Sequence, residues 1–458
     1  MRVCELAGKR VGLWGAGREA QSAYRALSAL APPSSFTVVS DEPASSEQRA
    51  QFAGDDAPVS FSDGEDTQAA LGGCEVVIRS PGVSRYRPEI AMLERAGVGF
   101  TTATNLWMAE HPDAPAIAVT GTKGKSTTSS LIAHMARSDG AGVVLAGNIG
   151  VPLLDYLHPA EPVDLWVLEL SSYQTADLER SPRVAVLLNL YPEHIDWHGS
   201  HERYYRDKLN VLRDSERVLA VLNARDERLR AIAPPANTVW FARRDSYDAR
   251  GQEIRRDGEV LLRAEDSPLS GEHNALNICA ALAALEAFGR PVSDVAGALT
   301  GFQALPHRLQ LIHVAGRVSY IDDGISTTPQ STMAALAALA GTRVALIAGG
   351  YDRGQDYSEL AQAILNSGVA AVVALPDTGE RLLEEVRAYA AQATLHAPLL
   401  IAVQGMHEAV QRACEALGGE GVVLLSPAAP SFGAYRDFKE RSQHFIRAAT
   451  DSQALEVS

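Results

Sequence analysis

Short apolar runs alternate with amphipathic segments along this 458-residue chain. Near the start, the runs at 10–14 and 36–40 predict two buried strands, and the segment 21–30 between them predicts a helix. The apolar run 76–78 predicts another strand. Strands that alternate with helices in this way are typical of an α/β fold with a mostly parallel sheet.

The same alternation starts again in two later parts of the chain. The second series begins with the apolar run 116–120, and its further strand and helix patterns lie at 165–168, 184–188, 200–210, 218–262 and 278–288. The third series has predicted strands at 318–321, 344–348, 371–375, 399–403 and 422–425. The length is too great for one core and suggests two to four domains. The three series indicate three, at 1–106, 107–313 and 314–458.

Composition and charge exclude several classes of protein. The formal net charge of −15 argues against binding nucleic acid or an anionic membrane surface, because both need a basic field. The four cysteines are far apart and form no C-x-x-C pair, so neither a zinc site nor a disulfide framework is expected, and a reducing cytoplasm fits best. No apolar run approaches the length of a membrane span, and the N-terminus lacks the features of a signal peptide.

The segment that follows the run 116–120 predicts a phosphate-binding loop. Gly121 and Gly124 allow a tight turn whose N–H groups face inward, Lys125 can reach the outer phosphates, and the hydroxyl of Ser126 or Thr127 can hold Mg²⁺. The alternative is an ordinary strand-to-helix turn that contains a lysine. The context favours phosphate binding, because the motif opens a helix directly after a strand.

Two further turns follow predicted strands of the first domain. The glycine-rich segment 15–20 opens the first helix, and Asp41 ends the next strand, where nucleotide-binding folds place a carboxylate on a ribose or base. This turn could hold NAD, hold another nucleotide, or have no ligand. The turn 80–82, which reads Ser-Pro-Gly, lies at the same expected edge of the sheet.

Polar residues at later strand ends and on later helices predict more of a nucleotide site. Glu169 ends a strand beside the phosphate loop and could meet Mg²⁺, and His194 could bind a metal or a phosphate. Asn274 and Asn277 share a helix face, where they could bind a base or phosphate or cap the helix. Arg308 follows a Pro-His turn at a domain junction, well placed to grip a phosphate.

Two other parts of the pattern lead to separate expectations. From its helical context alone, Lys208 is expected to be a surface lysine of an amphipathic helix. In the last domain, three polar loops at strand ends, 322–329, 349–354 and 426–433, predict a second substrate site, although any one of them could be a plain turn.

With these pieces in order, the chain resembles the Mur ligases, the ATP-dependent amide-forming enzymes of peptidoglycan precursor synthesis. The resemblance spans essentially the whole chain and rests on the motifs Gly121–Thr127, Gly147–Gly150, Glu169–Ser172, Glu193–Asp196, Tyr205–Lys208, Gly271–Asn274 with Asn277, Pro306–Arg308 and Asp322–Thr328. It implies a Rossmann-like N-terminal domain for the UDP-sugar, a central P-loop ATPase-like domain with a mostly parallel sheet, and a C-terminal Rossmann-like domain for glutamate. The first domain and the Ser426-Pro427 loop look like the branch that adds glutamate to UDP-N-acetylmuramoyl-L-alanine.

The resemblance also assigns roles to residues. The implied ATP contacts are Gly121, Thr122, Lys123, Gly124, Lys125, Ser126, Thr127, Asn277, Arg308 and Asp323. The implied UDP-substrate contacts are Gly15, Ala16, Arg18, Glu19, Asp41, Ser80, Gly82, Asn148 and His194. The implied Mg²⁺ ligands are Ser126, Glu169, His194 and Lys208, the last after CO₂ converts it to a carbamate, which reverses the expectation of a surface lysine. Lys125, Glu169, His194, Lys208 and Arg308 are the implied catalytic residues, and Thr327, Arg353, Ser431 and Phe438 the implied glutamate contacts.

One departure from the usual pattern concerns the glutamate itself. Enzymes that add D-glutamate carry a lysine where this chain has Ile325, and a second lysine corresponds to Arg353. The loops 322–329 and 426–433 instead resemble the branch that adds L-glutamate. We therefore expect L-glutamate, with D-glutamate as the alternative, and a monomer. A nicotinamide-dependent dehydrogenase would leave the phosphate loop unexplained, and a non-catalytic nucleotide-binding protein would have no need of Lys125, Glu169, His194 and Lys208 together.

Overall fold

The computed structural model describes residues 1–451 except 42, 55–56, 65–66, 192, 270, 304–305, 353 and 432, and it does not describe the side chain at 196. Contacts divide the chain into two compact units. The first unit is Met1–Ser267 with Asn274–Phe302, and the second is Pro268–His273 with Gln303–Ser458. Among the described residues, no helix is long and apolar enough to cross a membrane.

The first unit begins with a five-stranded parallel sheet in the order β3-β2-β1-β4-β5. Its strands are β1 (Arg10–Trp14), β2 (Ser35–Ser40), β3 (Val59–Asp63), β4 (Val76–Arg79) and β5 (Gly99–Thr101). The helices of this part are α1 (Arg18–Leu30), α2 (Ser46–Ala50), α3 (Thr67–Gly72), α4 (Pro88–Arg95) and α5 (Ala103–Glu110), after the 3₁₀ helix η1 (Val3–Leu6). Helix α1 buries Ala20, Ala23 and Leu27, which recur at helical spacing and so form one apolar face.

A second parallel sheet, in the order β11-β10-β9-β6-β8-β7, follows in the same unit. Its strands are β6 (Ala116–Thr120), β7 (Val143–Gly147), β8 (Leu165–Glu169), β9 (Val184–Leu187), β10 (Leu219–Asn223) and β11 (Thr238–Phe241). Beside it lies a small antiparallel sheet of β12 (Tyr247–Arg250), β13 (Glu253–Arg256) and β14 (Glu259–Leu262). The helices are α6 (Lys125–Ser138), α7 (Ser172–Thr175), α8 (Ile195–His198), α9 (His201–Leu209), α10 (Glu227–Ala231), α11 (Glu272–Phe288) and α12 (Val295–Leu299), with 3₁₀ helices η3 (Leu153–Tyr156), η4 (Asn210–Leu212) and η5 (Ala264–Asp266).

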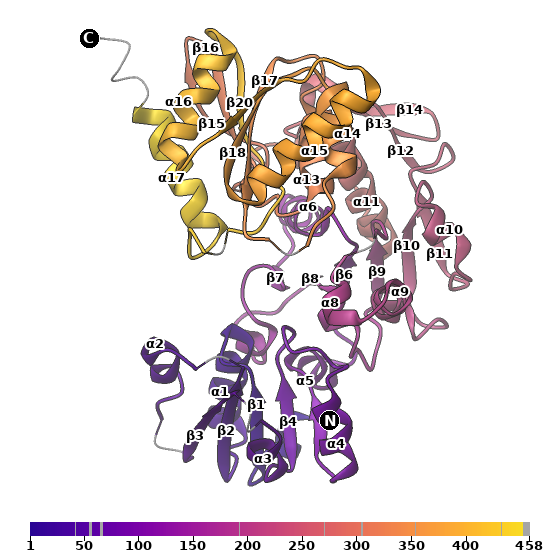
Figure 1. Ribbon diagram of the computed structural model, residues 1–458. Coiled ribbons are helices and arrows are strands. Elements are labelled where there is room, and N and C mark those ends of the chain that lie inside the picture. The colour runs from indigo at the N-terminus through magenta and orange to yellow at the C-terminus, as the bar shows by residue number, and fades with distance from the viewer. Residues whose placement is uncertain are drawn as a thin grey trace. The chain divides into compact units, whose positions relative to one another are not determined.

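The second unit contains a six-stranded sheet in the order β15-β16-β20-β17-β18-β19. Its strands are β15 (Gln310–Ala315), β16 (Arg317–Asp322), β17 (Val344–Gly350), β18 (Val369–Asp377), β19 (Leu399–Ala402) and β20 (Glu420–Leu425). Only β15 pairs antiparallel among the described strands of this sheet. The helices are α13 (Pro329–Ala338), α14 (Ser358–Asn366), α15 (Thr378–Ala393), α16 (Met406–Leu417) and α17 (Phe438–Asp451), and Figure 1 shows helices packed against this sheet in orange and yellow.

The predicted α/β class with three mostly parallel sheets is confirmed, whereas the domain boundaries at 106 and 313 stay predictions. The sequence pattern missed β3, β5, β7 and β15, which are short or lie at sheet edges. Strand β3, for example, buries none of its five residues, so it lacks the apolar run by which strands were recognised. Helix α1 also begins at Arg18, before the predicted start at residue 21.

Candidate active site

The phosphate loop lies between the end of β6 and the first turn of α6, as predicted. Gly121 and Gly124 have φ values of 144° and 85°, which residues other than glycine rarely adopt. A Cβ at Gly124 would also lie 2.4 Å from Asn277 Oδ1, so a larger residue there would require the Asn277 side chain of α11 to move. The loop therefore presents backbone and the positive end of α6 to a ligand.

Three side-chain groups fix the shape of this loop. Lys125 Nζ donates to the carbonyls of Gly121 and Thr122 at 3.0 and 2.9 Å. Lys123 Nζ donates to Glu193 Oε1 at 2.9 Å, and the Lys123 N–H donates to Asn189 Oδ1 at 2.8 Å. Ser126 and Thr127 occupy the first turn of α6, half-buried and buried respectively.

Glu169 is a buried carboxylate that is only half satisfied by the protein. It ends β8 with 1% of its surface exposed, and its Oε1 accepts from Asn148 Nδ2 at 2.6 Å. Its Oε2 is buried and has no hydrogen-bond partner among the described residues. An unpartnered buried carboxylate oxygen is costly, and a bound cation would satisfy it. Glu169 therefore fits the predicted place on a metal ion.

Glu193 and His194 follow β9 and have strongly shifted pKa values. Burial alone would raise the pKa of Glu193, but Lys123, His194 and Lys125 together lower it to about 2. Burial lowers the pKa of His194 to about 4, although Glu193 opposes this shift. At neutral pH the imidazole is thus neutral and can offer a lone pair to a metal. No contact was predicted for Glu193 from the sequence. Its place directly before His194, on a loop after a strand, was the signal that could have identified it.

Lys208 is buried, so the expectation of a surface lysine is wrong. It lies on α9 with 2% of its surface exposed, and its Nζ donates to the Gly121 carbonyl at 2.9 Å. Burial, reinforced by Lys125, lowers the pKa of Lys208 well below its usual value. The pattern failed because α9 packs on the phosphate loop, 87 residues away in sequence. Lys208 and Lys125 thus meet at one carbonyl.

Asn277 lies inside α11 and not at its start, so the capping alternative is wrong for it. Its Oδ1 accepts from Thr128 Oγ1 at 3.3 Å, and its Nδ2 donates to Asn274 Oδ1 at 3.2 Å. The two asparagines share a helix face, as expected, and Asn277 adjoins the phosphate loop at Gly124.

The predicted UDP-substrate residues other than Asn148 and His194 lie at the carboxyl edge of the first sheet, whereas those two follow strands of the second sheet. A Cβ at Gly15 would lie 2.5 Å from Ser80 Oγ, so the turn that contains Ala16 and the turn 80–82, with Gly82, adjoin each other. Arg18 Nη1 donates to the Gly150 carbonyl at 3.2 Å, beside Asn148. Glu19 accepts from Gln174 at 3.1 Å, and burial raises its pKa to about 7. Asp41 pairs with Arg87 at 2.6 Å, an arginine that sequence reasoning missed.

In the second unit, the three loops at the sheet edge are joined by backbone hydrogen bonds. The N–H groups of Ala428, Gly349 and Tyr351 donate to the carbonyls of Ser326, Pro427 and Pro430 at 2.9, 2.8 and 2.9 Å. Arg441 of α17 is fully buried and donates to the carbonyls of Gly324 and Ala429, each at 3.0 Å. Arg441 was not predicted, although it falls on the buried face of its helix with Phe445 and Ala448.

The predicted residues of the second unit lie on or beside these loops. Asp323 is buried and accepts from Ser426 Oγ at 2.8 Å and from the Leu309 N–H at 3.2 Å; burial raises its pKa to about 6. Arg308 lies near enough for its charge to act on Asp323. Thr327 is half-buried and Ser431 is buried. The centroids of the Phe438 and His307 rings lie 5.8 Å apart. Arg353 lies outside the described residues.

Comparison with known families gives two matches. The profile described as "Mur ligase middle domain" matches residues 119–285, and that described as "Mur ligase, glutamate ligase domain" matches residues 307–429. Together they cover more than half of the chain.

Curated relatives match over nearly the whole length. The UDP-N-acetylmuramoyl-L-alanine–L-glutamate ligase of Xanthomonas euvesicatoria is 43% identical over 98% of this chain and 97% of its own. The protein of the same name from Xylella fastidiosa is 42% identical over 99% and 98%, and that from a Micromonospora species 39% identical over 99% and 99%.

Solved structures share the fold at low identity. UDP-N-acetylmuramate-alanine ligase MurC from Thermotoga maritima has a TM-score of 0.60 at 19% identity, covering 97% of this chain and 100% of its own. MurF ligase from the same organism, in complex with ADP, has a TM-score of 0.60 at 14% identity, covering 91% and 96%.

Proposed function

This chain belongs to the Mur ligase family, and from that premise we propose that it joins L-glutamate to UDP-N-acetylmuramoyl-L-alanine with ATP, in peptidoglycan precursor synthesis. The observation that carries the proposal is the full-length likeness to relatives that are named for this reaction. The buried site around Gly121 supports it, since a phosphate loop, an unsatisfied carboxylate and a buried lysine meet there. Use of ATP and four free thiols favour a cytoplasmic enzyme, and the monomeric state stays a prediction.

ATP would be held at the phosphate loop, by Gly121–Thr127 together with Asn277. The Lys125 ammonium, now bonded to the carbonyls of Gly121 and Thr122, would turn to the phosphates when ATP binds. We propose Arg308 and Asp323 of the second unit as further nucleotide contacts, with Arg308 offsetting charge on the transferred phosphoryl group.

Four residues fit a magnesium ion: Ser126, Glu169, His194 and Lys208. Glu169 has an unpartnered oxygen, and His194 is neutral at pH 7 because burial lowers its pKa to about 4. Burial also lowers the pKa of Lys208 well below its usual value, which favours the amine form whose nitrogen can attack CO₂ and lose a proton to give a carbamate oxygen ligand. When bound, Mg²⁺ would offset the negative charge of the ATP phosphates.

The reaction then follows from the substrates. The alanyl carboxylate attacks the γ-phosphorus of ATP, ADP leaves, and an acyl phosphate forms. The glutamate amine attacks the acyl carbon, phosphate leaves, and the amide forms with loss of a proton. Lys125 offsets the repulsion between the two anions in the first step.

The contacts proposed for the UDP-substrate and those proposed for glutamate are supported by different observations. For the UDP-substrate they are Gly15, Ala16, Arg18, Glu19, Asp41, Ser80, Gly82, Asn148 and His194. The proximity of Gly15 and Ser80 favours a shared binding edge. For glutamate they are Thr327, Arg353, Ser431 and Phe438, and the choice of L-glutamate is supported by Ile325 and by the names of the relatives.

A ligation assay with each glutamate enantiomer tests the proposal. ADP release should require both UDP-N-acetylmuramoyl-L-alanine and L-glutamate, with D-glutamate at least about tenfold poorer in kcat/KM, which corresponds to about 1.4 kcal/mol. Preference for D-glutamate would refute the choice of enantiomer alone. ADP release that needs neither substrate would refute ligation.

A further inference from the structure

A chain of buried and half-buried hydrogen bonds connects the loop that carries Ser80 with the helix that carries Lys208. Asp207, the residue before Lys208 on α9, is 4% exposed. Its carboxylate accepts from the Tyr86 hydroxyl, with Oη at 2.7 Å from Oδ1 and 2.9 Å from Oδ2. It also bonds His198 Nδ1 at 2.7 Å. Tyr86 follows β4, so the chain spans both sheets of the first unit.

His198 continues the connection toward Glu169. Its ring is fully buried, and its Nε2 lies 3.0 Å from Ser172 Oγ. A carboxylate can only accept, so Nδ1 donates to Asp207, and in the neutral ring Nε2 accepts from the serine hydroxyl. Ser172 begins α7, three residues after Glu169. One histidine thus ties α9, which carries Lys208, to α7, which begins three residues after Glu169.

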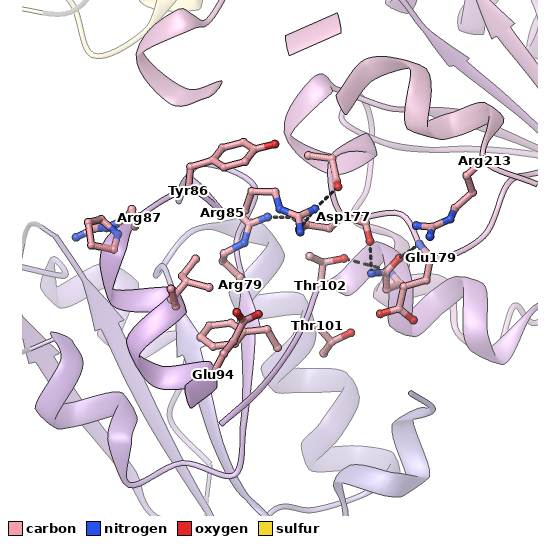
Figure 2. Close-up of a pocket in the computed structure, with 16 residues that line it drawn as sticks. Arg79, Arg85, Tyr86, Arg87, Glu94, Thr101, Thr102, Asp177, Glu179 and Arg213 are labelled. Carbon is pink, nitrogen blue, oxygen red and sulfur yellow. Dashed lines mark hydrogen bonds and ion pairs between the residues drawn. The ribbon is translucent and has the colours of Figure 1, made fainter. Parts of the chain in front are cut away.

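A second set of contacts fixes Tyr86 itself. Trp197 Nε1 donates to the Pro81 carbonyl at 3.0 Å, and Ser84 Oγ donates to the Trp197 carbonyl at 2.6 Å. Tyr86 lines a cavity of about 480 Å³. Arg79 and Arg85 line it as well and pair with Asp177 (Figure 2). The segment from β4 to Tyr86 is therefore anchored to the central part of the same unit.

On its other side, α9 touches the phosphate loop. Tyr204 Oη lies 2.7 Å from Thr122 Oγ1, and Lys208 Nζ donates to the Gly121 carbonyl at 2.9 Å. The helix has nine residues, too few to be stable alone, so these tertiary bonds decide where it lies. A shift at Asp207 would move the adjacent Lys208.

Serine, histidine and aspartate in this order also form the triad of many hydrolases. That role does not fit here, because Ser172, His198 and Asp207 are 3%, 0% and 4% exposed and a substrate cannot reach the serine.

We propose that Tyr86, Asp207, His198 and Ser172 are positioning residues that hold Lys208 and the Glu169 loop in place for ligation. Through Tyr86, this arrangement depends on the segment that carries Ser80. The inference rests on the proposed function and adds to it a physical link between the nucleotide-substrate loop and the catalytic lysine.

Tyr86→Phe tests the link, because it removes one hydroxyl and keeps the ring. The matched control is Tyr205→Phe, since the Tyr205 hydroxyl makes no hydrogen bond within the described part of the chain. We expect Tyr86→Phe to lower kcat about tenfold while the Kd of the UDP-substrate changes less than about twofold. Hydrogen exchange of the α9 amides should speed up, and any ¹³C-carbamate signal of Lys208 should fall. Ser172→Ala should act in the same direction by about threefold.

The outcomes separate the two proposals. Unchanged kcat and unchanged α9 exchange in Tyr86→Phe would overturn the positioning role. A raised Kd at unchanged kcat would overturn it as well, since Tyr86 would then serve substrate binding alone. A wild-type protein that forms no amide would instead refute the proposed function, and the α9 exchange would still decide whether Tyr86 positions the helix.

Discussion

In the first unit, charged side chains gather around one carbonyl of the phosphate loop, whereas in the second unit three loops are joined mainly by backbone hydrogen bonds. Lys125 and Lys208 both donate to the Gly121 carbonyl. In the second unit, Arg441 is a buried charged group that touches the loops from inside, and it donates to a carbonyl of each of the three, at Gly324, Gly349 and Ala429. The first region thus holds the proposed catalytic side chains, and in the second region a buried cation sets the shape of the loops.

This difference has a consequence for mutation. A substitution in the first region should remove catalysis and leave the fold, because its side chains are the proposed catalytic and metal-binding groups. A substitution at Arg441 should change stability and amino-acid binding together, because the same bonds maintain both.

Lys208→Ala is expected to have the largest effect. It should lower kcat by on the order of 10³-fold, because it removes the proposed carbamate ligand, and added short carboxylates should restore part of the activity. Steady-state ligation assays with and without acetate measure this. Lys9→Ala, far from the site in sequence and half-buried, is the control. Full activity of Lys208→Ala would exclude a catalytic role for Lys208.

Arg441→Lys, in the second region, is expected to have the second-largest effect. The ammonium keeps the buried charge but cannot reproduce the fork that reaches both Gly324 and Ala429, so about 3 kcal/mol of unfolding free energy should be lost. The KM for glutamate should rise on the order of tenfold while the KM for ATP stays within twofold. Urea unfolding and initial rates test both.

Arg447→Lys is the matched control for Arg441→Lys, since Arg447 is exposed on the same helix. If Arg441→Lys lowers stability but leaves the glutamate KM unchanged, the loops do not need this residue for amino-acid binding, and the contrast between the two regions disappears.

Asp323 gives the second unit a predicted pH dependence. Burial raises its folded pKa to about 6, above an unfolded value of about 3.9. The folded state therefore binds more protons between these values, and this stability is lost as pH rises from about 4 to 6, by at most about 3 kcal/mol. Asp323→Asn should remove that loss. Urea unfolding at pH 4.5 and 7 measures it, and an equal difference between variant and wild type at both pH values would contradict it.

The sequence predicted more of the first region than of the second. The phosphate loop was predictable because Gly121–Thr127 is contiguous and follows an apolar strand. The parallel α/β class was predictable because buried strands appear as apolar runs. The burial of Lys208 was not, since it depends on a contact with a loop 87 residues away.

Long-range contacts limited the prediction of the second region even more. Arg441 lies 117 residues from Gly324, and no motif joins them. The chain Tyr86–Asp207–His198–Ser172 was missed for the same reason, because the Tyr86–Asp207 bond spans 121 residues. Arg441 and Asp207 follow the burial patterns of their helices, but their partners cannot be deduced from periodicity.

Gly124→Ala should have the smallest effect, and it tests whether the first region is fixed by close packing as well as by charge. A Cβ there would lie 2.4 Å from Asn277 Oδ1, and φ is 85°. Gly140→Ala is the matched control, with φ of 78° and nothing within 4 Å of the added Cβ. Both variants should lose about 1 kcal/mol from backbone strain. Only Gly124→Ala should also raise the KM for ATP, because Asn277 must move from the loop. Equal ATP KM values in the two variants would mean that the contact with Asn277 does not shape the nucleotide site.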